Sequence, residues 1–160
     1  PFLIDTAAKY GFQHNIPLTF IKNYSAQVLK ANMRIVGACE WAVLLYRDKL
    51  PKFRNNGKMV FTCREWIEDR NTPKIHPTQK PVALYTWILK HYAKPGDRIL
   101  DTHVGSASSL IACHRAGLEY WGFEIDETYY DMARARLDRE RAQVNIFDVM
   151  RGAKKDDFGA

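Results

Sequence analysis

The chain has 160 residues, which is enough for one domain that buries its own hydrophobic core. Hydrophobic residues make up 46% of it and charged residues 26%, a balance that is typical of folded globular proteins and excludes a disordered chain. The sequence shows neither a signal peptide nor an apolar run near the roughly 18 residues of a membrane-spanning helix. Because residue 1 is proline rather than methionine, we expect a processed or truncated product that lacks its original N-terminus.

The net charge of +6 is concentrated between residues 22 and 74, where basic residues outnumber acidic ones. Such a surface attracts phosphate backbones, although many basic proteins bind no nucleic acid. The three cysteines, Cys39, Cys63 and Cys113, are far apart and form no Cys-x-x-Cys pair. We therefore expect reduced thiols, without a zinc site or a disulfide framework, in a cytoplasmic protein.

The N-terminal half predicts a mixture of strands and loops after one short helix. The apolar spacing of residues 2–12, which closes at Gly11, predicts the helix. Compact apolar runs predict a strand over residues 16–21 and a buried strand over residues 41–46. Residues 22–36 are basic, of uncertain structure and expected to be exposed, and residues 48–58 have the Pro, Asn and Gly content of a loop.

The C-terminal half alternates strands and helices, which is the pattern of an α/β protein with a parallel sheet. The predicted elements, in order, are a loop over 74–81, a helix over 82–92, a strand over 98–101, a helix over 109–115, a strand over 120–125, a helix over 127–141, a third strand over 144–147 and a frayed tail from residue 152. We expect a mostly parallel sheet with helices on both faces and a ligand site at the carboxyl ends of the strands.

A loop of small residues, 101–109, joins the predicted strand to the predicted helix. Small residues let the backbone approach a ligand, and the free amides of a helix N-terminus can hold its polar atoms. Glu124 follows 23 residues after Asp101, at the end of the next strand, where an acid can accept hydrogen bonds from ribose hydroxyls. An ordinary strand–helix turn would also explain the loop.

The loop holds one glycine, Gly105, and therefore lacks the three-glycine pattern that seats a dinucleotide pyrophosphate. The acid at the strand end, Asp101, would repel a pyrophosphate and attract an amino group. A nucleoside without phosphates, such as S-adenosylmethionine, suits this loop better.

Three motifs together resemble the permuted (β-group) DNA adenine and cytosine amino-methyltransferases. They are His76-Pro77-Thr78-Gln79-Lys80-Pro81, the loop 101–109, and Gly122-Phe123-Glu124-Ile125-Asp126. The resemblance covers most of the chain, with residues 1–60 matching only in the order of elements, and it looks closest to phage or prophage versions. It implies the Rossmann-like fold of S-adenosylmethionine-dependent methyltransferases.

The loop departs from the family pattern Asp-Pro-Phe-x-Gly-Ser-Gly-Thr-Thr at several positions. Thr102 replaces proline, His103 replaces phenylalanine, Ala107 replaces the second glycine, and Ser108 and Ser109 replace two threonines. Most of these changes keep size or ring character, so we expect cofactor binding to survive.

The resemblance implies roles for individual residues. Thr78 and Lys80 would lie near the methionine carboxylate, Asp101 near the amino group and Glu124 on the ribose, although Lys80 has an ordinary alternative as a solvated cation at a helix start. The full set expected to bind the cofactor is Thr78, Lys80, Asp101, Thr102, His103, Gly105, Ser106 and Glu124. No metal is expected, because the sulfonium is already an activated methyl donor.

Contact with double-stranded DNA is expected from the basic middle of the chain. The candidate residues are Arg34, Lys52, Arg54 and Lys58. The alternative for all four is a solvated, charged surface.

The catalytic Asp-Pro-Pro-Tyr tetrapeptide of the family, or one of its variants, does not occur in residues 1–160. The segment most similar to it is Asn15-Ile16-Pro17-Leu18, but Leu18 has no ring to stack on a base. We interpret this segment as the entry to a core strand. We expect the catalytic strand upstream of residue 1, a gap or an unusual pairing in the sheet where it would lie, and no methylation of DNA by this chain alone.

The resulting hypothesis is a bacterial or phage DNA methyltransferase, of the kind found in restriction-modification systems, that acts on an exocyclic amino group. One domain is expected over residues 1–160, with a sheet portion and DNA-contacting loops in 1–75, a cofactor-binding portion in 76–150 and a tail in 151–160. The expected protein partner is a second copy or a complementing N-terminal segment. The alternatives are a non-catalytic nucleic-acid-binding module with a vestigial fold, and a small-molecule or RNA methyltransferase, which the His-Pro-Thr-x-Lys-Pro segment disfavours.

Overall fold

The computed structural model describes residues 2–22, 27–48, 58–66 and 72–143. The predicted strand at 144–147, the tail, most of the predicted loop 48–58, and Lys52 and Arg54 lie outside these residues. The chain divides into two compact units, described separately below: residues 1–73 with 83–94, and residues 74–82 with 95–160.

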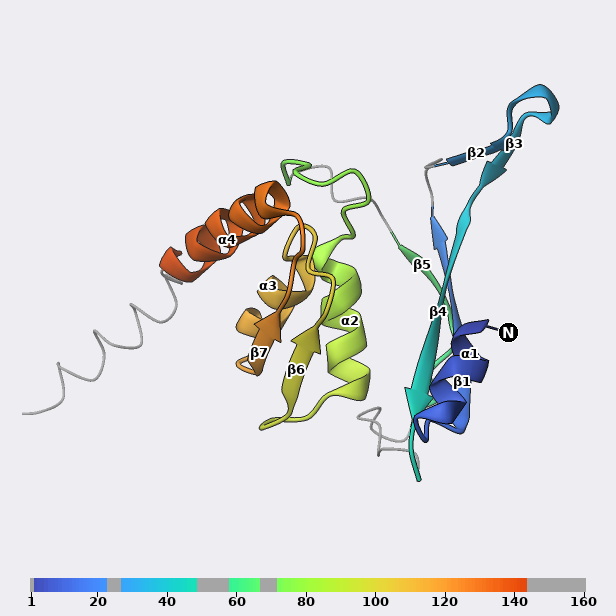
Figure 1. The fold of residues 1–160 in the computed structure, drawn as a ribbon, viewed down its shortest axis with the longest axis horizontal. Coiled ribbons are helices and arrows are strands. Elements are labelled where there is room, and N and C mark those ends of the chain that lie inside the picture. Colours follow the sequence, from blue (N-terminus) through green and yellow to red (C-terminus); the bar gives the residue numbers. More distant parts are fainter. Residues whose placement is uncertain (1, 23–26, 49–57, 67–71, 144–160) are drawn as a thin grey trace, which may run out of the picture. The chain divides into compact units, whose positions relative to one another are not determined.

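The first unit contains a three-stranded sheet, a short hairpin and two helices (Figure 1). Its elements are α1 (Phe2–Lys9), β1 (His14–Lys22), β2 (Gln27–Lys30), the 3-10 turn η1 (Ala31–Met33), β3 (Ile35–Gly37), β4 (Cys39–Tyr46), β5 (Cys63–Trp66) and α2 (Val82–Tyr92). The sheet has the order β4-β1-β5, in which β1 runs antiparallel to β4 and parallel to β5. The strands β4 and β1 form the pair His14↔Tyr46 at one end and Ile21↔Cys39 at the other.

The core of this unit lies on one face of β1. Alternate residues of the strand are buried there, because side chains of a strand point to opposite faces in turn. Leu18 and Phe20 pack with Trp66 of β5 and Leu84 of α2. The Phe20 ring stacks on Trp66 with 5.4 Å between ring centroids and meets Trp87 edge-on. The burial of Leu18 supports the interpretation of Asn15–Leu18 as the entry to a core strand.

Several predictions for this unit need correction. The helix ends at Lys9 rather than residue 12, because Gly11 adopts a φ of +86° and the chain reverses there. The strand predicted as buried over 41–46 is only half-buried, and Trp41 is 81% exposed. Lys22, expected to be exposed, is buried and donates to Glu40 at 3.1 Å. Burial of a lysine is tolerated because this carboxylate compensates its charge.

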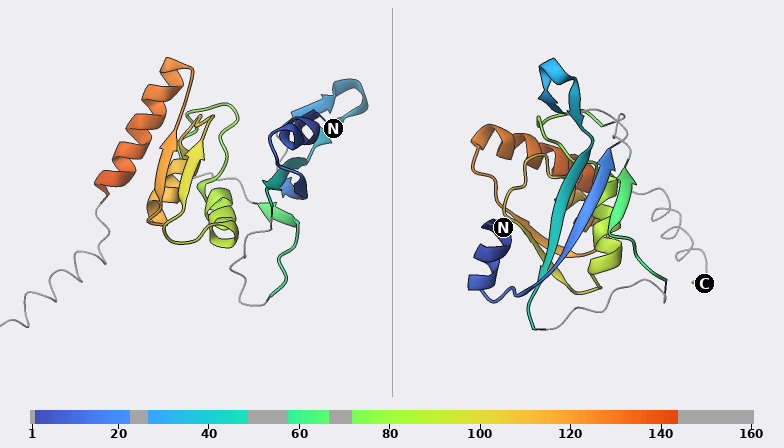
Figure 2. Two further views of the ribbon diagram at one scale, coloured as in Figure 1. Left: turned by 60° about the horizontal axis from the view of Figure 1, so that its bottom comes forward. Right: turned by 90° about the vertical axis from the view of Figure 1, so that its right-hand side faces the viewer.

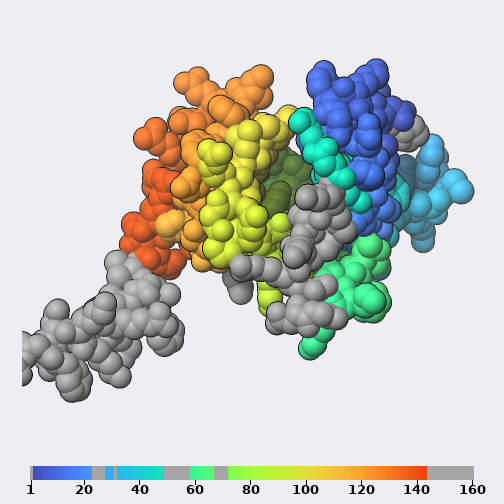
Figure 3. All heavy atoms as spheres, turned by 90° about the horizontal axis from the view of Figure 1, so that it is seen from below, coloured from blue at the N-terminus to red at the C-terminus, as the bar shows by residue number. Residues whose placement is uncertain are grey.

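The strands β2 and β3 extend the β1–β4 pair into a protruding hairpin (Figures 1 and 3). Arg34, at its turn, has a left-handed backbone with a φ of +53°. The hairpin exposes apolar side chains, namely Val28, Leu29, Met33, Ile35 and Val36. This segment, for which the sequence indicated no definite structure, is thus an ordered arm.

The described residues of the second unit form two parallel strands and two helices, and the strands lie side by side in Figure 2. The elements are β6 (Arg98–Asp101), α3 (Ser108–Arg115), β7 (Glu119–Gly122) and α4 (Glu127–Ala142). The register runs from Arg98↔Glu119 to Asp101↔Gly122, so the two strands end together. The four elements match the predicted order, and β7 ends three residues before the predicted limit.

The α/β class is confirmed. In the described ranges, β6 and β7 share no ladder with β4-β1-β5, and the hairpin β2–β3 forms a third sheet. The antiparallel pairs β1–β4 and β2–β3 depart from the expected mostly parallel sheet. None of the helices described is both long and apolar enough to cross a membrane.

We expect the stability of the first unit to fall in mild acid because of His91. Its ring lies against Trp87, and its Nδ1 is buried without a hydrogen-bond partner among the described residues. Burial lowers its pKa below 6.5, and the nearby charges of Lys90 and Arg64 lower it further. Below pH 6.5 the unfolded chain therefore binds more protons than the folded one, which favours unfolding.

Urea unfolding between pH 7.5 and 5.5 tests this expectation. The free energy of unfolding of the wild type should fall more steeply with decreasing pH than that of His91→Leu. Equal slopes for the two proteins would contradict it.

Candidate functional site

The loop between β6 and α3 is closed by the side chain of Asp101. One carboxylate oxygen accepts a hydrogen bond from the backbone amide of His103 at 2.9 Å, and the other accepts one from the Ser109 hydroxyl. These bonds connect the end of the strand to the first turn of the helix. The carboxylate that the sequence assigned to a ligand amino group thus also closes the loop.

Glu124 connects the ends of the two parallel strands. It follows β7, and its Oε2 accepts a hydrogen bond at 2.8 Å from the amide of Gly105, in the loop after β6. Its Oε1 accepts from the amide of Asp126 at 3.1 Å. The hydrogen bonds from Asp126 and Gly105 lower the pKa of this carboxyl group. The site therefore carries an ionised acceptor at neutral pH.

The backbone around the loop adopts left-handed conformations at two residues. Gly105 has a φ of +53°, which glycine adopts without steric cost. Ala107 has a φ of +61° while its side chain is only 1% exposed. This is the position where the family pattern has its second glycine, and the left-handed backbone explains that preference.

The helix α4 holds the other side of the loop. Arg136 donates to the carbonyl of Ser106 at 2.6 Å and to the hydroxyl of Ser108 at 2.9 Å. Further along, Arg115 of α3 forms two hydrogen bonds with the Glu140 carboxylate. The position of the loop therefore depends on a helix that follows it in sequence by about 20 residues.

The segment from residue 75 to 79 packs beside the loop as a hydrogen-bonded turn. The amide and hydroxyl of Thr78 lie 3.3 and 3.1 Å from the His76 Nδ1, and the Gln79 amide donates to the His76 carbonyl. The His76 ring lies against Gly105 and against the Tyr129 ring of α4. Thr78 is exposed and Lys80 is half-buried in the same unit.

The remaining predicted residues take different positions. Thr102 and His103 are exposed and their side chains contact each other at 2.9 Å. Ser106 is buried with its hydroxyl on Ser108, so its side chain faces the protein rather than solvent. Arg34 and Lys58 are exposed in the first unit.

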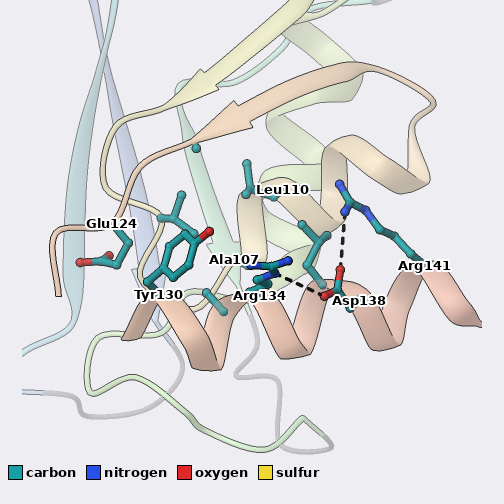
Figure 4. Close-up of a pocket in the computed structure, with 11 residues that line it drawn as sticks. Ala107, Leu110, Glu124, Tyr130, Arg134, Asp138 and Arg141 are labelled. Atoms are coloured by element: carbon teal, nitrogen blue, oxygen red, sulfur yellow. Dashed lines mark ion pairs between the residues drawn. The ribbon is translucent and has the colours of Figure 1, made fainter. Parts of the chain in front are cut away.

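A cavity of about 240 Å³ lies between α3, β7 and α4 (Figure 4). Its wall includes Leu110 and Ala107, and at its rim Asp138 pairs with Arg134 and Arg141 at 3.9 and 3.5 Å. The Glu124 carboxylate points away from these residues in Figure 4. The cavity is smaller than the roughly 300–1,000 Å³ of ordinary ligand sites. Glu124 and the loop residues Val104 and Ala107 also line this cavity, and we place the candidate site at the outward-facing Glu124 carboxylate and the loop.

Two residues of the site, His76 and Arg136, were not predicted from sequence. His76 was quoted as part of a motif, but its ring contact with Gly105 depends on tertiary packing. Arg136 lies in the predicted helix over 127–141, to which no site residue was assigned. The hydrogen-bonding partners of Arg136 and the packing partners of His76 lie in other elements, so the sequence carried no signal for them.

The sequence model of the N6/N4 DNA methylases matches residues 6–135. The chain belongs to this family. Two type II methyltransferases are among its relatives: M.HpaI of Haemophilus parainfluenzae, 40% identical over 67 residues, and M.HinfI of Haemophilus influenzae, 30% identical over 89 residues. These matches cover 42% and 56% of the chain, but only 21% and 25% of the relatives. The methylase chain thus spans about a quarter or less of the curated relatives it matches.

Solved structures confirm the methyltransferase fold of this family member. M1.HpyAVI in its S-adenosylmethionine complex gives a TM-score of 0.73 at 23% identity, covering 85% of this chain and 68% of that one. The cytosine-N4-specific PvuII DNA methyltransferase gives a TM-score of 0.60 at 14% identity, and the match covers 74% of this chain and 49% of that one. TTHA0409 of Thermus thermophilus, in its complex with S-adenosylmethionine, gives a TM-score of 0.58 at 20% identity. The match covers 86% of this chain and 58% of that one.

Gly122, at the end of β7, is expected to tolerate no side chain. A Cβ there would overlap the Val104 side chain and lie 2.9 Å from a Leu110 methyl. We expect Gly122→Ala to lower the free energy of unfolding by about 1–3 kcal/mol through overpacking. Chemical denaturation measures the effect.

The double variant Val104→Ala with Gly122→Ala provides the control. Removing the Val104 methyl groups relieves the overlap, so the two changes together should cost less than the sum of the single changes. If the changes in unfolding free energy of the two single variants were strictly additive in the double variant, the contact with Val104 would not be the cause of the destabilisation in Gly122→Ala.

Ala107→Gly is expected to stabilise the protein. An L-residue with a left-handed backbone costs roughly 1–2 kcal/mol, and glycine removes this cost while losing one buried methyl group and gaining freedom in the unfolded chain. The net gain should be up to about 1 kcal/mol by the same reasoning, measured as a higher melting temperature. The matched change Ala112→Gly, in the middle of α3 and equally buried, should destabilise. A loss of stability in both variants would show that Ala107 is not strained.

Proposed function

We propose that this chain is the S-adenosylmethionine-binding part of a DNA methyltransferase that acts on the exocyclic amino group of adenine or cytosine. One observation carries the proposal: in a member of this family, an ionised carboxylate and a left-handed glycine amide meet where two parallel strands end. We further propose that both units belong to one methyltransferase domain over residues 1–160.

The residues fit this cofactor. The Glu124 oxygens accept hydrogen bonds from two backbone amides. Because the carboxylate is ionised, it has further lone pairs that can accept hydrogen bonds from ribose hydroxyls. Gly105 leaves the loop without a side chain at its apex. M1.HpyAVI and TTHA0409 share this fold, and each has been solved with S-adenosylmethionine, which supports the choice of ligand.

The other predicted residues would hold the amino-acid end of the cofactor. Asp101 would attract its amino group through the negative charge that also closes the loop. Thr78 and Lys80 would lie near its carboxylate, with Lys80 supplying the opposite charge. When bound, the cofactor supplies a methyl group on a positively charged sulfur, and the role of this chain is to position that group.

We propose that the hairpin β2–β3 contacts double-stranded DNA. A two-stranded ribbon fits the major groove, and Lys30 and Arg34 place positive charge near its turn. Lys58 in the same unit would add a contact to a phosphate. The net charge of +6 favours the encounter with DNA at low salt.

We propose that the groups holding the target base come from outside residues 1–160. Leu18, the last residue of the segment most similar to the catalytic tetrapeptide, is buried in the core and offers no surface to a base. A complementing segment would complete the site in the cytoplasm of a bacterium. Incubation of residues 1–160 with labelled S-adenosylmethionine and DNA should therefore give no labelled DNA, and transfer of label that is abolished by Asn15→Ala would overturn this view.

Glu124→Ala should weaken binding of S-adenosylmethionine by tenfold or more, because it removes the acceptor for the ribose hydroxyls. Calorimetry measures this change, and Glu119→Ala, at the opposite end of β7, is the matched control. Because the pKa of Glu124 is lowered, wild-type affinity should not decline through loss of its charge until the pH falls below the ordinary carboxyl value of about 4.5. Unchanged affinity in Glu124→Ala would remove this residue from the site.

Substitutions in the hairpin should weaken DNA binding in a salt-dependent way. For Lys30→Ala and Arg34→Gln, we expect the slope of log affinity against log salt to fall by about 1 for each lost phosphate contact. Lys9→Ala, an equal loss of charge on α1, should change the slope little. Equal effects of all three changes would indicate a general charge effect rather than a contact at the hairpin.

A further inference from the structure

His76 contacts the loop at the face of Gly105 where a side chain would project. Three atoms of its ring lie 3.7 Å from the position that a Gly105 Cβ would occupy. On its other side the ring packs against Tyr129, the third residue of α4, with 4.4 Å between centroids and 59° between planes. The imidazole thus fills the space between the loop and the start of a helix.

The orientation of this ring is set by its own turn. Nδ1 accepts a hydrogen bond from the Thr78 amide at 3.3 Å and lies 3.1 Å from the Thr78 hydroxyl. The His76 carbonyl accepts a hydrogen bond from the Gln79 amide at 3.1 Å. The side-chain oxygen of Gln79 in turn accepts a hydrogen bond from the Ile75 amide at 3.1 Å. These hydrogen bonds within the turn fix the orientation of the His76 ring.

The peptide that His76 supports carries the amide that binds Glu124. Gly105 donates to Glu124 at 2.8 Å, and its left-handed backbone has no side chain of its own to hold it in place. Other contacts hold the residues on either side of it: the Val104 amide donates a hydrogen bond to the Phe123 carbonyl at 3.0 Å, and Arg136 donates one to the Ser106 carbonyl at 2.6 Å. Loss of the His76 ring would thus loosen the Gly105 peptide itself, while these neighbouring contacts and the bond between Asp101 and Ser109 remain.

We propose that His76 is a positioning residue for cofactor binding, which acts by holding Gly105 so that its amide orients the Glu124 carboxylate toward the ribose. The proposal rests on the proposed S-adenosylmethionine site. It assigns a function to the first residue of the His-Pro-Thr-x-Lys-Pro segment through packing of its ring, without direct contact with the ligand.

Three variants separate the ring from its hydrogen bond. His76→Phe keeps a ring of similar size without the Nδ1 acceptor, His76→Asn keeps an acceptor near the Nδ1 position without most of the ring, and His76→Ala lacks both. His114→Ala is the matched control, because His114 is a histidine of the same unit whose ring faces a tyrosine, Tyr120, away from the loop.

Two measurements on residues 1–160 test the proposal. Calorimetry with S-adenosylhomocysteine should show a loss of affinity of tenfold or more in His76→Ala and His76→Asn, at most about threefold in His76→Phe, and little change in His114→Ala. Hydrogen exchange without ligand should show faster exchange of the Gly105 amide in the first two variants, while amides in the middle of α3 exchange at the wild-type rate.

The possible failures are distinguishable. Absence of binding in the wild type would contradict the proposed function, whereas the exchange rate of Gly105 would still report on positioning by His76. Wild-type exchange at Gly105 in His76→Ala would overturn the inference, as would wild-type affinity in that variant. Faster exchange throughout α3 would show that His76 stabilises the whole unit rather than the loop, and would also overturn it.

Discussion

The hydrogen bond between the Gly105 amide and the Glu124 carboxylate is the interaction on which the rest of the site depends. It joins the segments that follow two parallel strands, and it forms only because the register Asp101↔Gly122 makes those strands end together. The close approach of Val104 and Leu110 to β7 then requires the absence of a side chain at Gly122. This polar contact and the missing Cβ therefore fix the side of the loop that faces β7, while Arg136 of α4 holds the other side. The conformation of the loop, in turn, determines which atoms remain available to a ligand.

The site combines a fixed negative charge with a backbone that is held from several sides. Amides of Asp126 and Gly105 keep Glu124 ionised, and Asp101 closes the loop with a second carboxylate. Two acids at the ends of adjacent parallel strands suit a ligand with hydroxyl and amino groups and disfavour one with phosphates. Ala107 is an exception to this good fit, because its left-handed backbone is adopted at a steric cost. The anchors at Asp101 and Arg136 supply the interactions that hold it there.

The strands and helices of the second unit were predictable because local signals agreed. The short apolar run and the small-residue loop that follows it both indicate a strand over residues 98–101, and the observed β6 coincides with it. In the first unit the local signals were ambiguous. The hairpin β2–β3 and strand β5 are short, and pairing with neighbouring strands stabilises them in a way that no local pattern encodes. For the same reason Trp41 was expected in the core, since apolar character alone does not tell which face of a strand is covered.

The sequence by itself determined the family, the α/β class and the two acids of the candidate site, because motifs of fixed spacing place Asp101 and Glu124 at the ends of consecutive strands. Only the tertiary structure decided how these acids are used. Asp101 turned out to close its own loop, and the roles of His76 and Arg136 arise from contacts between residues 28 to 53 positions apart in the chain. The physical reason is that a motif specifies local backbone and chemical groups. The partners of those groups, by contrast, are chosen by packing between distant segments.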